Sequence, residues 1–151
     1  MRFSPIILKQ QEILYLDILR VKKYMPTKDK YFSVEEANEV VPQLLVDIPR
    51  IQKLMESLTH KYPDVKKARA KAQLNGGSLQ GGDYINCVFQ ANFLTERLES
   101  KGCILKGIKY GLVDFLSLRE GKEVYLCWKN PEQQIEYWHD IQSGFAGRRR
   151  I

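Results

Sequence analysis

The chain has few of the residues on which redox and metal chemistry usually depend. Three separated cysteines, Cys87, Cys103 and Cys127, occur in 151 residues, and the histidines are His60 and His139. An odd cysteine count without a C-x-x-C pair argues against a disulfide framework and against a zinc ribbon. Two histidines are too few for a multi-histidine iron or copper centre. We therefore expect a protein of a reducing compartment, the cytoplasm.

Long apolar runs are also missing. The N-terminal run Pro5–Leu8 ends at Lys9, whereas a secretory signal needs about 7–15 apolar residues and a membrane span about 18. The glycine-rich loop at residues 76–82 lacks the Lys-Ser/Thr pair of a phosphate-binding P-loop. The sequence therefore predicts no signal peptide, no membrane span and no phosphate cradle.

What is present is a heptad pattern in two segments. A capping box at Ser33 and Glu36 opens the first, and Asp83 and Gly102 bound the second. Their apolar residues alternate at spacings of three and four, which is typical of helices that pack lengthwise: Val34, Ala37, Val41, Leu44, Ile48, Ile51, Met55, Leu58 and Tyr62, then Tyr84, Cys87, Ala91, Leu94 and Leu98.

These two segments predict a long antiparallel helical hairpin joined by residues 63–82. The same seam could instead join two chains, so a homodimer stays open. Pro42 and Pro49 lie inside the first segment, and we expect a kink or a break there.

After Gly102 the apolar period changes to two. Strands are predicted over residues 103–108, 112–118, 123–129 and 135–139, with Glu120-Gly121 as a hairpin turn. The fold class is therefore α+β, a helical hairpin followed by a small three- or four-stranded antiparallel sheet. Residues 31–151 are expected to form a single α+β domain.

Residues 1–30 are predicted to be an N-terminal extension and linker, with a helix over 6–23. Met25 is an alternative start, so residues 1–24 are expected to be dispensable and are a candidate untranslated segment.

The basic residues suggest a first function class. The net charge is +6, which attracts nucleic acid or acidic proteins. A basic helix over residues 64–75 and the C-terminal tail supply the candidates, although such runs also serve as solvated faces. The leading hypothesis is a non-catalytic binding or assembly module for RNA or another acidic partner. Its candidate contacts are Lys66, Lys67, Arg69, Lys71, Arg149 and Arg150.

A cluster of polar residues on one face of the sheet suggests the alternative function class. This is a small enzyme or a metal- or ligand-binding protein. The expected strand registers place Asp114 opposite Cys127, Cys127 opposite Tyr137, and Tyr125 opposite His139, all on one face. The other face gathers the apolar residues Val113, Phe115, Val124, Leu126, Trp128 and Trp138.

Carboxylate, thiol and imidazole together suit either a metal site or a nucleophile–base pair. We expect Asp114 and His139 to form a fixed pair, with Cys127 as the reactive thiolate or the metal ligand. Tyr125 and Tyr137 are candidate ligand-binding residues, and Arg148 is expected to close the site over an anion. Three donors are fewer than the four of a structural zinc site, and the sequence identifies no cofactor. The polar face could also serve only for packing.

Several blocks of sequence resemble one known family. They are the Tyr31–Asn38 block with Pro42 after it, Gly111–Phe115, Gly121, Leu126–Trp128, Tyr137–His139 and Gly144–Arg148. In order and spacing they resemble the family called domain of unknown function 2203, over residues 31–149. The resemblance implies a small prokaryotic cytoplasmic protein and supplies no activity. This chain has Leu116 where the family usually has Pro, and Asn130-Pro131-Glu132 where it has Gly-Glu.

Overall fold

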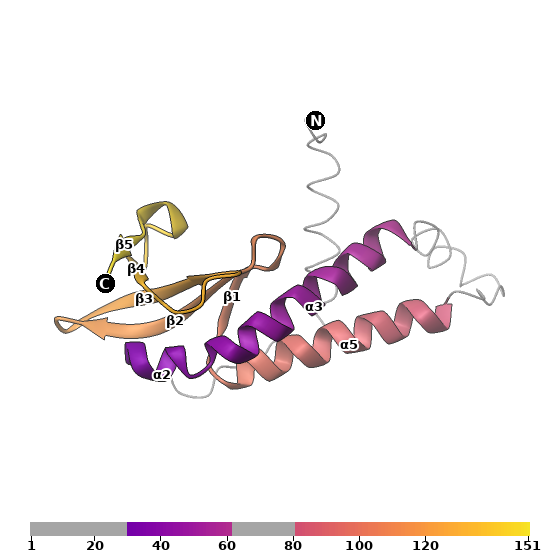
Figure 1. The fold of residues 1–151 in the computed structure, drawn as a ribbon, viewed down its shortest axis with the longest axis horizontal. Coiled ribbons are helices and arrows are strands. Elements are labelled where there is room, and N and C mark those ends of the chain that lie inside the picture. Colours follow the sequence, from indigo (N-terminus) through magenta and orange to yellow (C-terminus); the bar gives the residue numbers. More distant parts are fainter. Residues whose placement is uncertain (1–29, 62–80) are drawn as a thin grey trace. The chain divides into compact units, whose positions relative to one another are not determined.

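A computed structural model describes residues 30–61 and 81–151 (Figure 1). The helix predicted over 6–23, the basic helix over 64–75 and most of the joining loop lie outside these residues. The described chain divides into two compact units. Residues 54–61 and 81–93 belong to the first, and residues 30–53 and 94–151 to the second. None of the described helices is long and apolar enough to cross a membrane.

The first heptad segment forms two helices, α2 (Val34–Asn38) and α3 (Val41–His60). The capping box is confirmed, because the Ser33 side chain accepts from the Glu36 N–H and the Glu36 carboxylate accepts from the Ser33 N–H. The expected break occurs just before Pro42, which falls in the first turn of α3, where a missing N–H costs nothing. At Pro49 no break is found, and α3 continues through it.

The second heptad segment forms α5 (Gly81–Ser100). It begins two residues before Asp83, so Asp83 lies in its first turn and is not the N-cap as predicted. In the second unit Arg97 pairs with Asp47, and in the first unit Tyr84, Cys87 and Val88 pack on Leu58. Within each unit a segment of α3 therefore packs against a segment of α5, as the predicted hairpin requires. Buried seam residues are Val41, Leu44, Ile48, Ile51, Leu58, Ala91, Leu94 and Leu98.

Replacing Ile51 with Ala tests the seam. Ile51 is 1% exposed, and truncating such a side chain is expected to lower the free energy of unfolding by about 2–5 kcal/mol. Val46 on the same helix is 53% exposed, so Val46→Ala should change it by less than about 0.5 kcal/mol. Urea unfolding of both variants measures the difference, and equal losses would show that Ile51 is not in a packed seam.

The sheet has five antiparallel strands in the order of the sequence. They are β1 (Ile104–Gly107), β2 (Leu112–Arg119), β3 (Lys122–Lys129), β4 (Tyr137–Asp140) and β5 (Arg149–Arg150). Both predicted registers are confirmed: Asp114 lies opposite Cys127, Cys127 opposite Tyr137 and Tyr125 opposite His139. The predicted count is one strand short, because β5 has two residues and shows no alternation.

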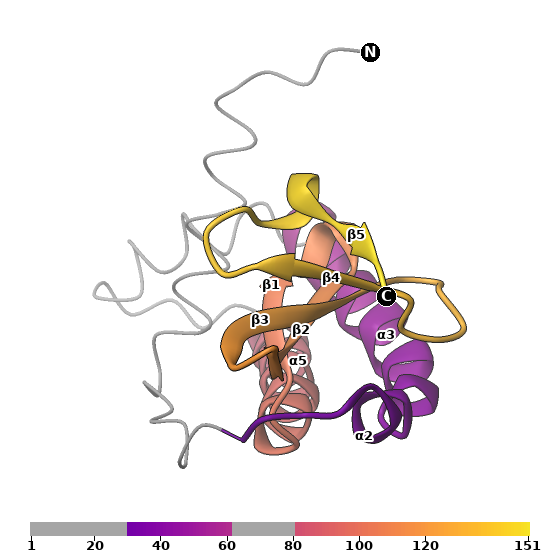
Figure 2. The ribbon, with the colours of Figure 1, turned by 90° about the vertical axis from the view of Figure 1, so that its left-hand side faces the viewer.

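The two faces of the sheet are covered by different elements. On one face Phe115 packs edge-on against Phe32, with 5.1 Å between the ring centroids, and Val113, Leu126 and Trp128 are buried with it. Within the second unit, α2 and the adjoining part of α3 lie on this side (Figure 1). The short helix η3 (Phe145–Gly147) and β5 lie on the side away from α2 (Figure 2). The candidate polar residues belong to this second face.

Candidate functional site

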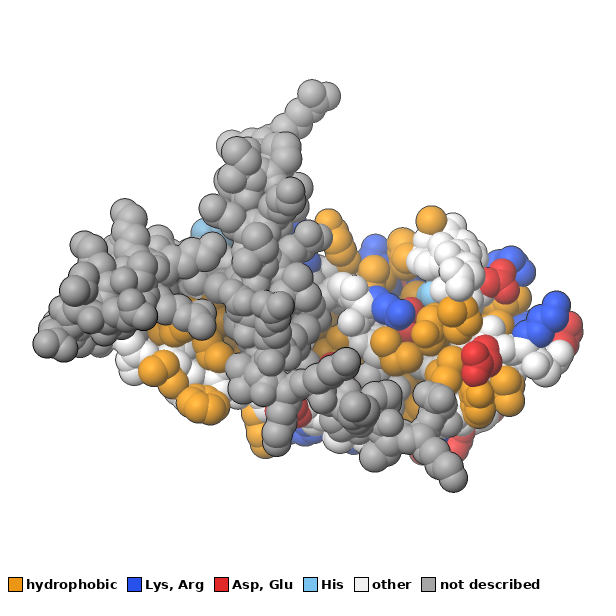
Figure 3. Space-filling view, turned by 180° about the vertical axis from the view of Figure 1, so that it is seen from behind, with side chains coloured by type: hydrophobic (Ala, Val, Ile, Leu, Met, Phe, Trp, Pro, Cys, Tyr) orange, Lys and Arg blue, Asp and Glu red, His pale blue; other side chains and the backbone are white. Residues whose placement is uncertain are grey.

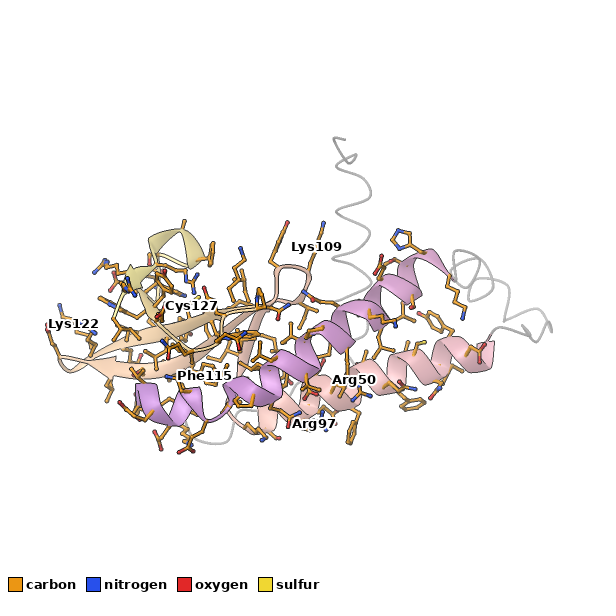
Figure 4. The ribbon with its side chains drawn as sticks, in the orientation of Figure 1. Arg50, Arg97, Lys109, Phe115, Lys122 and Cys127 are labelled. Atoms are coloured by element: carbon orange, nitrogen blue, oxygen red, sulfur yellow. The ribbon has the colours of Figure 1, made fainter. Side chains whose placement is uncertain are left out.

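Three neighbouring strands bring one carboxylate, one thiol and one imidazole together. Asp114 is on β2, Cys127 on β3 and His139 on β4, and one ligand atom of each lies within 4.8 Å of the other two. Figure 4 shows Cys127 and Phe115 on opposite sides of the sheet. The three side chains are 2%, 1% and 3% exposed. This buried trio, which we call the Asp–Cys–His centre, gathers unusually polar groups for the interior of a small sheet.

Hydrogen bonds fix the orientation of the His139 ring. Its Nδ1 lies 2.9 Å from the carbonyl oxygen of Asp140, which can only accept, so Nδ1 carries a proton. Its Nε2 lies 3.2 Å from Asp114 Oδ2, so the structure brings the two residues of the expected pair together. At this distance the two atoms can share a proton or bind one metal ion.

The Cys127 thiol is not the activated thiolate that the sequence suggested. Burial raises the pKa of Cys127 to about 12, and the Asp114 carboxylate, which also accepts the thiol hydrogen bond, raises it further. The nearby Arg148 guanidinium lowers the pKa, but by less than burial raises it. The thiol is therefore protonated near neutral pH, because a buried anion beside a carboxylate is unfavourable.

Two tyrosines flank the Asp–Cys–His centre, each beneath a cation. Tyr125 contacts the His139 ring edge-on at 5.6 Å between centroids, and the Lys106 ammonium lies 4.6 Å from the Tyr125 centroid. On the other side, Tyr137 lies beside Cys127, and the Arg148 guanidinium carbon is 4.1 Å from its ring centroid. Both candidate tyrosines thus border the centre.

Arg148 is already paired, contrary to the expectation that it would close over an anion. Its Nη2 donates to both carboxylate oxygens of Glu132, at 2.7 and 2.8 Å, and to the Cys127 carbonyl at 3.1 Å. Glu132 was missed by sequence reasoning, since it lies in the turn where this chain departs from the family's usual pattern. Its carboxylate already supplies the anion that the guanidinium needs.

The other two arginines of the C-terminal tail are also paired with carboxylates. Arg149 pairs with Asp140 at 2.6 Å, and Arg150 lies 3.7 Å from Glu136. On the side seen in Figure 3, basic and acidic side chains adjoin over the sheet. The other nucleic-acid candidates, Lys66 to Lys71, lie outside the described residues. The described part of the chain therefore supplies little support for an anion-binding strip.

Fold and centre together define a small α+β protein whose helix-backed antiparallel sheet holds buried Asp, Cys and His side chains. The sequence profile of the family described as "Uncharacterized conserved protein (DUF2203)" matches residues 30–151, and the chain belongs to this family. The match confirms the resemblance found in the sequence blocks. The chain matches no curated protein and no solved structure.

Proposed function

We propose that the protein binds a divalent transition-metal ion of the zinc type at the Asp–Cys–His centre. The ligands are an Asp114 carboxylate oxygen, the Cys127 sulfur and His139 Nε2. One observation carries the proposal: these three donor atoms converge within 4.8 Å in a buried part of the sheet. Metal binding would make use of a carboxylate and an imidazole whose burial is otherwise costly.

The distances and donor types support zinc. Tetrahedral zinc holds N and O ligands at about 2.0–2.2 Å, which places two such ligand atoms about 3.4 Å apart. The Nε2–Oδ2 separation of 3.2 Å is close to that spacing. Sulfur and imidazole nitrogen suit zinc, whereas Mg²⁺ and Ca²⁺ require oxygen ligands. The bond from Nδ1 to a backbone carbonyl is the usual outer contact of a metal-bound histidine.

The other uses of this centre have less support. A nucleophilic enzyme needs a thiolate near neutral pH, and the raised pKa of Cys127 opposes that. Packing alone gives no reason to bury a carboxylate and an imidazole together, because their burial is costly. The metal-binding form of the alternative hypothesis is therefore the one that the geometry favours over a nucleophile–base pair.

Zinc titration of the metal-free protein tests the proposal. After dialysis against a chelator, the wild-type chain is expected to take up one Zn²⁺ per chain. Elemental mass spectrometry measures the zinc content. Cys127→Ala and His139→Gln should each weaken binding by more than about 100-fold, since contacts outside the ligand shell alone contribute 10–100-fold. Wild-type uptake well below one ion per chain contradicts the proposal.

A second buried cysteine gives the matched control. Cys103 is 4% exposed, and burial likewise raises its pKa to about 12, but it lies outside the Asp–Cys–His centre. Cys103→Ala should therefore keep the wild-type affinity for Zn²⁺. Equal losses in the Cys103 and Cys127 variants would show that a general effect of removing a buried thiol explains the result.

The affinity for Zn²⁺ should depend on pH. Because the metal-free Cys127 thiol has a pKa of about 12, binding has to displace its proton at neutral pH. The affinity is therefore expected to rise by at least about tenfold per pH unit between pH 6 and 8, and to fall on acidification. Competition with a chromophoric chelator at three pH values measures this, and a flat profile would argue against a thiolate ligand.

Binding of RNA or another acidic partner stays a prediction from the net charge of +6. If it occurs, the affinity for mixed RNA should fall steeply with salt, and each phosphate contact should steepen the slope of log K against log[salt] by roughly 0.7–0.9. Replacing Arg149 and Arg150 with Ala should then weaken binding equally on all sequences, since phosphate contacts carry no sequence information. An electrophoretic mobility assay without binding at low salt would remove this function.

A further inference from the structure

Arg148 and Glu132 form a pair that is held from several sides. The Arg148 side chain is 13% exposed and the Glu132 side chain 26% exposed. Beyond the two bonds between them, the Glu132 carboxylate accepts from the Lys129 N–H at 2.8 Å, and the Trp128 indole donates to the Glu132 carbonyl at 2.7 Å. We call this Arg148–Glu132 pair the latch. It ties the C-terminal tail to the turn between β3 and β4.

The latch borders the Asp–Cys–His centre. The Arg148 guanidinium lies between two rings, with its carbon 4.1 Å from the Tyr137 centroid and 4.9 Å from the Phe145 centroid. Tyr137 is the cross-strand neighbour of Cys127, and Arg148 also bonds the Cys127 carbonyl. One guanidinium therefore joins the tail, the turn and the backbone of a proposed ligand.

The closed latch leaves one polar group unsatisfied. Arg148 Nε is buried and has no hydrogen-bond partner among the described residues. A buried donor without an acceptor costs about 1–3 kcal/mol, and water would satisfy it if the side chain swung outward. This recovery offsets part of the cost of breaking the bonds to Glu132. It therefore lowers the free energy of an open state relative to the closed state.

We infer that the latch controls the entry and exit of the metal ion, with Arg148 and Glu132 as positioning residues that do not touch it. The inference rests on the proposed function. In the closed state the three ligands are buried, and the Arg148 guanidinium covers the Tyr137 ring beside Cys127. Opening the latch moves the guanidinium off Tyr137, releases the Cys127 carbonyl and admits solvent to the centre.

Release of Zn²⁺ to excess chelator tests the inference. In the full chain, Arg148→Met and Glu132→Gln are each expected to speed release at least about tenfold, the lower range for contacts outside the ligand shell. Arg149→Met is the matched control, because Arg149 also pairs with a carboxylate but its side chain is 58% exposed. It should release Zn²⁺ at the wild-type rate. Wild-type rates in both latch variants would overturn the inference.

A second readout does not need a metal. The rate at which N-ethylmaleimide modifies Cys127 in the metal-free chain, followed by mass spectrometry, should rise in Arg148→Met while circular dichroism stays native. Loss of a nearby cation makes a thiol less reactive, so a faster reaction reports access. A rate at or below that of the wild type overturns the latch, even if the chain binds no zinc and the proposed function fails.

The opposite side of the centre provides the competing route. Lys106 covers Tyr125, which borders His139. If the latch is the gate, Lys106→Met leaves both rates unchanged. If Lys106→Met speeds both reactions and Arg148→Met does not, the ion enters beside Tyr125 and the inference is wrong.

Discussion

Replacing Arg97 with Met is expected to lower the free energy of unfolding by about 3–5 kcal/mol, the usual cost of leaving a buried charge without its partner. The Asp47 side chain is fully buried between α3 and α5 and accepts from Arg97 Nε at 3.1 Å and from Nη2. Gln43 donates to the same carboxylate at 2.9 Å. Without Arg97, only the Gln43 amide among the described side chains remains to compensate the buried anion.

Replacing the partner, Asp47, with Asn should lower the free energy of unfolding by less. The Arg97 side chain is 35% exposed, so in Asp47→Asn its guanidinium can be solvated. The double variant Asp47→Leu, Arg97→Met removes both charges and should recover part of the loss, because apolar replacement of a buried ion pair is often neutral. Urea unfolding gives all three values. A loss below about 1 kcal/mol for Arg97→Met, as for an exposed ion pair, would contradict this account of the hairpin.

Zinc should stabilise the folded chain strongly. At free Zn²⁺ about a thousand times the dissociation constant, binding to the folded state alone adds about 4 kcal/mol to the free energy of unfolding. The reason is structural, since the ion would link β2, β3 and β4 through one side chain from each. Chemical unfolding at fixed free Zn²⁺, compared with unfolding in chelator, measures the gain.

The loss of that gain identifies the ligands. His139→Gln and Asp114→Asn should remove most of it, whereas Cys103→Ala should keep it despite its own cost to stability. If the zinc-dependent gain survives in His139→Gln, the ion is bound elsewhere. Because each variant is compared with itself in chelator, the stability that the substitution costs does not enter the comparison.

Local patterns predicted most of the architecture. The capping box at Ser33, the seam through Ile51 and the end of α5 before Gly102 follow from local spacing, and the structure has all three. The short hairpin turn at Glu120-Gly121 determines the register of β2 on β3. That register alone places Asp114 beside Cys127.

Tertiary pairing was the part that sequence reasoning missed. Whether Cys127 is a thiol or a thiolate depends on burial and on the balance between Asp114 and Arg148, and no local pattern gives that balance. The bond from Arg148 to Glu132 depends on how the tail returns to the sheet through η3, which has no periodic signal. The sequence analysis did not single out Asp47, which is paired across the seam with Arg97.

X-ray absorption at the zinc edge of the zinc-loaded chain tests the central claim most directly. The proposed centre predicts one sulfur neighbour at about 2.3 Å and nitrogen or oxygen neighbours at about 2.0–2.2 Å. The sulfur contribution should be absent in Cys127→Ala and unchanged in Cys103→Ala. A zinc ion surrounded only by nitrogen and oxygen in the wild-type chain, or by more than one sulfur, would contradict the Asp–Cys–His centre as the metal site.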